Sequence, residues 1–255
     1  MKVTVLGSAT SMGVPVIGCQ CDTCRSDDPR DKRLRSSALV EVEGKNILID
    51  CGPDFREQIL RAGSPAIDAI LLTHSHYDHV GGLDDLRPYT YRNPDLPIYC
   101  RADVASDIRS RLPYCFAENP YPGIPTLNLV EVSEDSQSVE ILPGIEVNPI
   151  PVWHGRLPIL GWRIGDFAYI TDASAIPDTS LERLRGLDTL ILNALRDKPH
   201  PTHFSIAEAI SVAQSLAPRQ TFFTHLAMEA GRHADLAARL PGGIAPAYDG
   251  LTLCL

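Results

Sequence analysis

Three histidines and an aspartate fall within six consecutive positions of the stretch THSHYDHVGG, as His74, His76, Asp78 and His79. The apolar run AIDAILL precedes them and predicts a buried strand that ends where they begin. Imidazole nitrogens and carboxylate oxygens are the ligands that hold divalent ions such as zinc and manganese. Two ligand pairs separated by a turn predict two neighbouring ions. A solvated polar loop or a capped helix start is the competing interpretation, and this density of ligand-type side chains disfavours it.

Polar residues also follow three later apolar runs, and two ions need these additional ligands. His154 follows IEVNPIPVW, Asp172 follows FAYIT, and His225 follows QTFFT. Taken singly, each is as readily an ordinary strand-end polar group. Together with the first cluster they complete two sites, in which His74, His76 and His154 hold one ion, Asp78, His79 and His225 hold the other, and Asp172 bridges them.

The surrounding pattern predicts the elements that position these residues. Short runs of strand character recur in both halves of the chain, from KVTVLG near the start to GLTLCL at the end. Helical patterns lie between the strands, at 54–63, from VGGL onward, after Ser205 and across EAGRHADLAARL. Ser205 forms a capping-box pattern with Glu208, three residues later. Many strands with helices in each half predict two sheets packed face to face and covered by helices, a four-layer α/β arrangement. No repeat or linker interrupts the pattern, so we expect one domain spanning 1–255.

Composition and charge limit the classes of function. The net charge of −9 and the sequence pI near 5.3 argue against broad electrostatic capture of nucleic acid or of an anionic membrane. There is no apolar run of about eighteen residues that could span a membrane, and MKVTVLGSAT lacks the apolar core of a signal peptide. We therefore expect a cytoplasmic protein with no membrane partner. A homodimer is the common default, and the proline-rich excursion at 113–126 is one candidate contact.

Three of the seven cysteines, Cys19, Cys21 and Cys24, gather in the stretch CQCDTC. An odd number of cysteines without an export signal fits metal binding and buried thiols better than a disulfide framework. The C-x-C-x2-C spacing on a glycine-bounded loop can fill three corners of a tetrahedral zinc site. The alternative is a set of reduced thiols in a tight loop.

The stretch THSHYDHVGG resembles the H-x-H-x-D-H signature of metallo-β-lactamase-fold hydrolases, and His154, Asp172 and His225 match the order of that family's later ligands. The resemblance covers essentially the whole chain, including the VLGSATSMGVP opening and the AYDGL ending. Within the superfamily, the chain is most similar to the phosphodiesterases of the carbon–phosphorus lyase pathway, which act on cyclic phosphates of ribose. The stretches GCQCDTC and HPTHFS support that similarity. The fold it implies is an αββα sandwich with a dinuclear site on the rim where both sheets end.

The resemblance implies a metal-dependent phosphodiesterase that hydrolyses a small phosphodiester through a hydroxide held between two divalent ions, Mn²⁺ or Zn²⁺. His203 matches the family's histidine that serves as general acid or electrostatic stabiliser, and an imidazole that titrates near pH 7 suits that role. Asp78 is expected to take part in catalysis as well as in metal binding. His200, three residues before His203, is the alternative for the general acid, and capping of the following helix is the non-catalytic alternative for His203.

The resemblance also implies a structural zinc at Cys19, Cys21 and Cys24, with a histidine three residues after His225 as the fourth ligand. That position holds Met228, which departs from the family pattern. A thioether is a poor zinc ligand, so His233 is the alternative for the fourth corner, although nothing in the sequence shows that it can reach.

Other hydrolases share the signature. Nucleases of the ribonuclease Z type normally add a basic flexible arm for tRNA, and no such arm is found in this acidic sequence, so nucleic acid is not the expected partner. Thioesterases of the glyoxalase II type are not excluded, although the HPTH stretch favours phosphoesters. A β-lactamase proper would usually be exported. Outside the enzymes, the remaining alternative is a non-catalytic metal-binding protein, and the complete ligand set argues against it.

Overall fold

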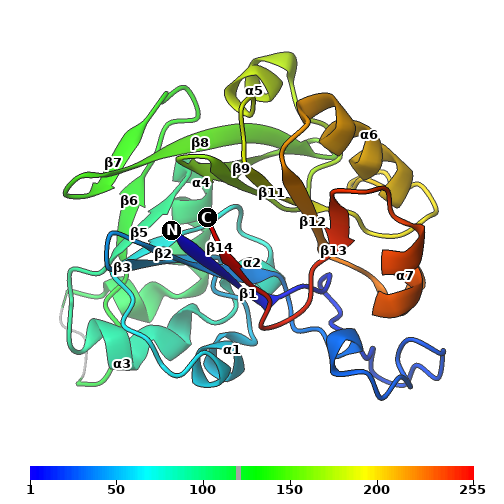
Figure 1. The fold of residues 1–255 in the computed structure, drawn as a ribbon. Coiled ribbons are helices and arrows are strands. Elements are labelled where there is room, and N and C mark those ends of the chain that lie inside the picture. Colours follow the sequence, from blue (N-terminus) through cyan, green and yellow to red (C-terminus); the bar gives the residue numbers. More distant parts are fainter. Residues whose placement is uncertain (119–121) are drawn as a thin grey trace.

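The computed structural model describes residues 1–118 and 122–255, and within them two seven-stranded sheets pack face to face (Figure 1). The first sheet has the spatial order β14 (Thr252–Cys254), β1 (Lys2–Gly7), β2 (Ser37–Val42), β3 (Lys45–Ile49), β4 (Ala69–Leu71), β5 (Pro97–Cys100) and β6 (Asn128–Glu131). Strands β14 to β3 are antiparallel to their neighbours, whereas β3 to β6 run parallel. The hairpin of β2 and β3 turns at Glu43 and Gly44, both of which have a positive φ.

The second sheet comes from the C-terminal half of the chain. Its spatial order is β13 (Ile244–Pro246), β12 (Gln220–Thr224), β11 (Thr189–Asn193), β10 (Phe167–Ile170), β9 (Leu157–Ile164), β8 (Ile145–His154) and β7 (Val139–Leu142). Strands β7 to β10 are antiparallel, and β10 to β13 are parallel. Each sheet is therefore mixed.

Alternation along the strands creates the layers, because successive side chains point to opposite faces of a sheet. On β3, Ile47 and Ile49 pack between the two sheets, in one cluster with Trp162 and Tyr169 of the second sheet. Leu48, between them in sequence, packs in a different cluster under the outer helices. All five side chains are fully buried. The central layer of the fold is thus an apolar core shared by both sheets.

Helices cover the outer face of each sheet (Figure 1). Against the first sheet lie α1 (Phe55–Arg61) and α4 (Ala102–Arg111), with α3 (Arg87–Thr90) nearby; against the second lie α5 (Asp178–Arg183), α6 (Ile206–Leu216) and α7 (His233–Arg239). The expected capping box of α6 is confirmed, with Ser205 and Glu208 each bonding the other's backbone N–H. The four-layer α/β sandwich predicted from the sequence is confirmed.

Two expected helices differ in detail. The helix expected to begin at VGGL begins earlier, as the short α2 (Tyr77–Val80), and a 3-10 turn, η2 (Leu83–Leu86), follows it. The helix expected across EAGRHADLAARL is interrupted at Gly231, whose φ of 92° lies in the left-handed region. A 3-10 turn, η4 (Met228–Ala230), precedes that glycine and α7 follows it.

Two further 3-10 turns are η1 (Pro29–Asp31) and η3 (Pro113–Phe116). The second opens the proline-rich stretch 113–126, of which residues 119–121 lie outside the described part of the chain. Among the described residues, no helix has both the length and the apolar character needed to cross a membrane.

Candidate metal centre

The predicted ligands meet because the strands that carry them run in one direction. In the second sheet, β8 and β10 are both antiparallel to β9, and β12 is connected to β10 through parallel neighbours. His154 is the last residue of β8, Asp172 follows β10, and His225 directly follows β12. The carboxyl ends of these strands share one edge of the sheet, where α/β folds commonly place their sites.

The first group of ligand atoms comes from His74, His76 and His154, whose nitrogens lie within 4.8 Å of one another. His154 donates from Nδ1 to the carbonyl oxygen of Thr202, 2.7 Å away, which leaves its Nε2 free to bind a cation. The Thr73 hydroxyl donates to Asp50 and can therefore accept from Nδ1 of His74, 3.0 Å away. The Nε2 atom of His74 is buried with no hydrogen-bond partner among the described residues, as expected of a metal-ligand atom.

The second group comes from Asp78, His79, Asp172 and His225, again with all four ligand atoms within 4.8 Å of one another. The Nε2 atom of His79 lies 3.2 Å from a carboxylate oxygen of Asp78 and 3.2 Å from one of Asp172. Neither contact is a hydrogen bond, so this buried nitrogen is also unpartnered among the described residues. The expected ligand set is therefore brought together in two adjoining groups.

Asp50 is a functional residue that the sequence reasoning did not single out. Its fully buried carboxylate accepts a hydrogen bond from Nδ1 of His79 at 2.6 Å and one from the backbone N–H of Thr73 at 2.8 Å. A carboxylate behind a ligand histidine fixes the ring and its tautomer. Asp50 lies directly after β3 in NILIDCG, and that strand-end position is the one signal that could have revealed it.

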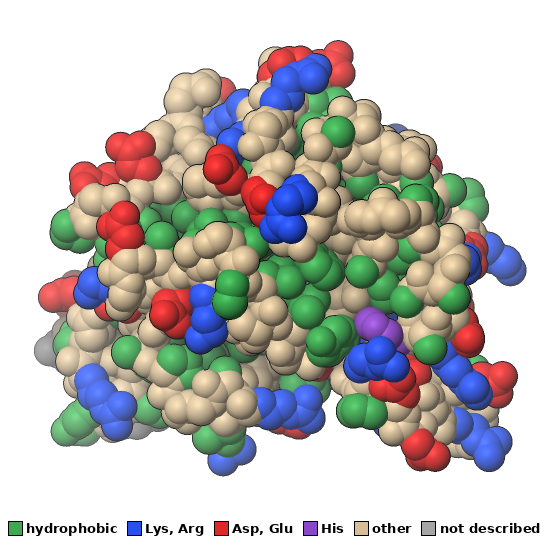
Figure 2. Space-filling model, viewed as in Figure 1, with side chains coloured by type: hydrophobic (Ala, Val, Ile, Leu, Met, Phe, Trp, Pro, Cys, Tyr) green, Lys and Arg blue, Asp and Glu red, His purple; other side chains and the backbone are tan. Residues whose placement is uncertain are grey.

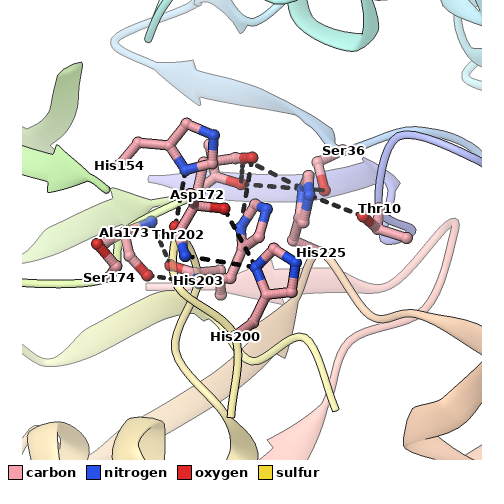
Figure 3. A network of polar contacts seen from close by, with 12 residues as sticks. Thr10, Ser36, His154, Asp172, Ala173, Ser174, His200, Thr202, His203 and His225 are labelled. Carbon is pink, nitrogen blue, oxygen red and sulfur yellow. Dashed lines mark hydrogen bonds and ion pairs between the residues drawn. The ribbon is translucent and has the colours of Figure 1, made fainter. Parts of the chain in front are cut away.

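His225 is held by residues from the N-terminal part of the chain. Figure 3 shows Thr10 and Ser36 beside its ring, on the side away from His203. The Thr10 hydroxyl lies 3.0 Å from Nε2 of His225, and the Ser36 hydroxyl lies 3.3 Å from Nδ1. Nδ1 also lies 3.1 Å from a carboxylate oxygen of Asp172. The opening stretch VLGSATS thus contributes to the site, which its sequence alone did not indicate.

Three site residues hold a backbone conformation that side chains other than glycine adopt rarely. Asp50, Asp172 and His225 have φ values of 61°, 58° and 55°. Such strain persists where the surroundings impose it, and it clusters at functional sites. At Asp172 the support is visible, because the side-chain amide of Asn193 bonds both the N–H and the carbonyl of Ala173, at 2.8 and 2.9 Å.

Close backbone approach holds α2 in place. The backbone N–H of Cys51 donates to the carbonyl of His79 at 2.8 Å, and that of Gly82 donates to Cys51 at 2.9 Å. A Cβ atom on Gly52 would lie 2.0 Å from the carbonyl oxygen of Asp78. The position after Cys51 therefore requires glycine, because any side chain would push Asp78 and His79 away from the site.

The charges in the site favour a bound cation. Burial disfavours the charged form of every group, yet the carboxylates of Asp172 and Asp78 raise the pKa of His79 well above the usual histidine value. Against burial, His225 and His79 hold the pKa of Asp172 well below its usual range. Burial lowers the pKa of His74 and His225, so both are neutral imidazoles, the form that binds metal. Ionised carboxylates beside the neutral imidazoles of His74 and His225 suit a divalent ion.

His203 lies beside this site, and His200 lies farther from Asp172 (Figure 3). The Nδ1 atom of His203 is 3.6 Å from a carboxylate oxygen of Asp172 and has no hydrogen-bond partner among the described residues. Its ring stacks on that of His225 at 4.9 Å. Burial and the neighbouring His225 lower its pKa to about 3. His200 instead accepts from the Thr202 hydroxyl at 3.1 Å, so it supports the loop that carries His203.

The cysteine cluster lies on a loop of its own. Cys19, Cys21 and Cys24 are free thiols whose sulfur atoms lie within 4.8 Å of one another. The thioether of Met228 lies beside them, 3.2 Å from the sulfur of Cys19. His233, the alternative fourth ligand, is not in this group of ligand atoms, because it begins α7, where its ring contacts Tyr248 at 5.4 Å. Among the described residues, the side chain beside the three thiols is thus the thioether of Met228.

Comparison with known proteins identifies the family. The family model for the beta-lactamase superfamily domain matches residues 45–226. A Porphyromonas gingivalis protein named octanoyltransferase is 45% identical over 253 residues, which cover 98% of this chain and 51% of that protein. The chain thus spans about half the length of that curated relative.

Solved structures agree with this assignment. A crystal structure of a diphosphatase from the PhnP family superposes with a TM-score of 0.91 at 44% identity, covering 99% of this chain and 96% of that one. Zinc-bound PqqB from Methylobacterium extorquens superposes with a TM-score of 0.78 at 23% identity over the full length of both chains, which shows the shared fold alone. The chain therefore belongs to the beta-lactamase superfamily and has the metallo-β-lactamase fold, close to the PhnP family.

Proposed function

We propose that this protein hydrolyses a small phosphodiester, with a cyclic ribose phosphate as one candidate, at a centre that binds two divalent metal ions. The observation that carries the proposal is the pair of adjoining ligand groups, with His203 next to Asp172 and free of any hydrogen bond among the described residues. The Nε2 atoms of His74 and His79, which are buried without a hydrogen bond among the described residues, support the proposal that these side chains bind metal ions. Asp172 lies within reach of both groups and is the proposed bridge between the ions.

When bound, such ions lower the pKa of a water molecule and neutralise charge that develops on phosphoryl oxygens. The protein's own side chains supply the rest. His79 holds the pKa of Asp78 well below its usual range against the effect of burial, so this carboxylate stays ionised and can orient a water by accepting a hydrogen bond from it. His203 rests as a neutral imidazole, and a phosphate brought against it favours the protonated form. We assign it to donate a hydrogen bond, or its proton, to the departing oxygen.

A diphosphate is the second candidate substrate. The observation that favours it is the 44% identity to a protein described as a diphosphatase of the PhnP family. Both reactions break a P–O bond and leave a phosphate to stabilise, so the same residues serve either. The metal ions are proposed to be Mn²⁺ or Zn²⁺, because imidazole and carboxylate ligands suit both.

A nuclease acting on tRNA is less consistent with the surface. On the face drawn in Figure 2, acidic and basic side chains of the described residues are interspersed, without a continuous basic tract. The net charge of −9 opposes long-range attraction of a polyanion. A small ester needs only the local positive charge of the metal centre.

A substrate panel tests the proposal. The protein is reconstituted with Mn²⁺ or Zn²⁺ and assayed on a cyclic ribose phosphate, bis(p-nitrophenyl) phosphate, a nucleoside diphosphate, a tRNA precursor and a glutathione thioester. We expect turnover of at least one phosphodiester, and loss of that turnover in the His203→Gln variant. Turnover of the diphosphate alone would assign the second candidate. Cleavage of only tRNA or the thioester would refute both, and metal uptake without any turnover would indicate a binding protein.

A further inference from the structure

A second cluster of metal-binding side chains lies outside the proposed catalytic centre and consists of sulfur alone. Cys19, Cys21 and Cys24 place their thiols within 4.8 Å of one another. The thioether sulfur of Met228 lies 3.2 Å from the sulfur of Cys19 and 3.8 Å from that of Cys24. Segments about two hundred residues apart in sequence thus bring four sulfur atoms together.

The surroundings hold these atoms in place. Cys24 is buried in a small apolar cluster with Ala9 and Val14, and Cys19 and Met228 pack against that cluster. Met228 begins η4, directly after Ala227, whose backbone N–H donates to the carbonyl of Leu195. The position of the thioether over the thiols is therefore set by the fold of both segments.

Backbone amides support the thiolate form. The N–H of Val16 donates to the sulfur of Cys24 at 3.3 Å, and the N–H of Cys21 lies 3.5 Å from the sulfur of Cys19. Donors aimed at sulfur stabilise its negative charge, which a cation needs in its ligand. Burial nevertheless raises the pKa of the Cys24 thiol to about 11, so a cation that binds here must displace its proton.

The identity of the fourth donor decides which cation fits. Structural zinc is bound by thiolate, imidazole or carboxylate ligands in a closed tetrahedron, and a thioether is not among them. The described residues offer no histidine or carboxylate atom in this group. The donor set therefore does not fit the closed zinc site that the family resemblance implies. Thiolates combined with a thioether match the preference of Cu(I).

We propose that Cys19, Cys21, Cys24 and Met228 form an all-sulfur site that selects Cu(I) over Zn²⁺. Binding displaces the thiol protons, and no change in the oxidation state of sulfur is involved. The site is separate from the proposed catalytic centre, so this inference stands or falls independently of the proposed function.

Competition titrations of the full-length, reduced protein under anaerobic conditions test the selectivity. Cu(I) is titrated against bicinchoninate and Zn²⁺ against a chromophoric zinc chelator, and X-ray absorption identifies the neighbours of each bound metal. Sulfur-only scattering distinguishes this site from the nitrogen and oxygen ligands of the catalytic centre. We expect one Cu(I) per chain with sulfur neighbours alone, and no Zn²⁺ in that environment when Cu(I) is present. Zinc that remains on the thiols in competition with Cu(I) would overturn the proposal.

Substitutions at the thioether separate its role from that of the thiols. Met228→Leu keeps the volume and removes the donor, so Cu(I) affinity should fall on the order of 10- to 100-fold, comparable with the loss of other metal-site partners. Met228→His supplies an imidazole and should move the preference to Zn²⁺. Met12→Leu, at an exposed methionine elsewhere, is the matched control and should change neither affinity. Unchanged Cu(I) affinity in Met228→Leu, with the circular dichroism of the native protein, would refute the role of the thioether.

Discussion

The carboxylate of Asp50 accepts a hydrogen bond from Nδ1 of His79 at 2.6 Å, and both side chains are completely buried. Asp50 follows β3, whereas His79 belongs to α2, which follows the next strand of the sheet. The contact therefore joins two connections at the same edge of the first sheet. Because Nδ1 bonds Asp50, the other ring nitrogen, Nε2, faces Asp78 and Asp172.

Replacing Asp50 should weaken metal binding without removing a ligand. In Asp50→Asn, the amide cannot accept from both Thr73 and His79 as the carboxylate does, so the orientation of His79 is lost. We expect metal affinity to fall on the order of 10- to 100-fold in chelator competition. Asp68→Asn, at the opposite end of the same pair of strands, is the control and should retain full affinity. Equal affinities of the two variants would show that Asp50 does not position the ligand.

Loss of Asp172 should affect both proposed metal positions together. Its carboxylate lies in the group of Asp78, His79 and His225 and also near the ligand atom of His154, so Asp172→Ala removes the proposed bridge. We expect elemental analysis to show less than one ion per chain and turnover to fall below detection. Asp166→Ala, at an exposed aspartate near the start of β10, should keep the metal content of the wild type. A variant at Asp172 that retains two ions and normal turnover would exclude the bridging role.

His203 and His200 should differ sharply in their effect on turnover. His203 lies beside Asp172, whereas His200 only supports the loop through Thr202. We expect His203→Gln to reduce kcat by about 10²- to 10⁴-fold, the usual contribution of a general acid, with metal content unchanged. His200→Gln should reduce kcat far less. The reverse ranking, in steady-state assays of both variants at saturating substrate, would move the assignment to His200.

A buried carboxylate away from the metal centre should make stability depend on pH. Asp249 accepts hydrogen bonds from the backbone N–H of Ser8 and Leu34, at 3.0 and 2.7 Å. Burial nevertheless raises its pKa to about 7, against an ordinary value near 3.8. The native state therefore binds a proton more tightly than the unfolded state, so this group's contribution to stability falls as the pH rises from about 4 to 7.

Asp249→Asn removes that titration. The free energy of unfolding of the wild type minus that of the variant should fall with rising pH, by at most about 1.4 kcal/mol per pH unit in this window, and level off above it. Urea unfolding at several pH values measures the difference, in which the other titrating groups cancel. Asp166→Asn serves as the surface control, with no such slope expected. A wild-type–variant difference that is independent of pH would show that Asp249 is ionised throughout.

The sequence predicted the elements best where the local pattern was strong. The capping box of Ser205 and Glu208 depends on neighbouring residues, and the structure confirms it. The division between η4 and α7 was missed, because EAGRHADLAARL favours a helix throughout. The left-handed φ of Gly231 interrupts that helix.

Within the site, the sequence predicted the ligand-type residues at strand ends. It did not predict the residues that hydrogen-bond to those ligands. His154 and His225 follow apolar runs that any reading of the chain reveals. Asp50 shares that strand-end position, but Thr10 and Ser36 carry no comparable signal, because their importance comes from the His225 ring that each one contacts across the fold. Such contacts join segments up to two hundred residues apart, and no local pattern encodes them.

The sequence by itself determined the chemical types of the ligands, their order along the chain and their places after apolar runs, since these depend on residue identity and short-range periodicity. Only the tertiary structure decided which atoms face one another. It turned His203 toward Asp172, put His200 against Thr202, and brought the thioether of Met228 to the cysteines instead of His233. The physical reason is that strand direction, sheet packing and backbone turns fix these distances jointly, through contacts between parts of the chain that are remote in sequence.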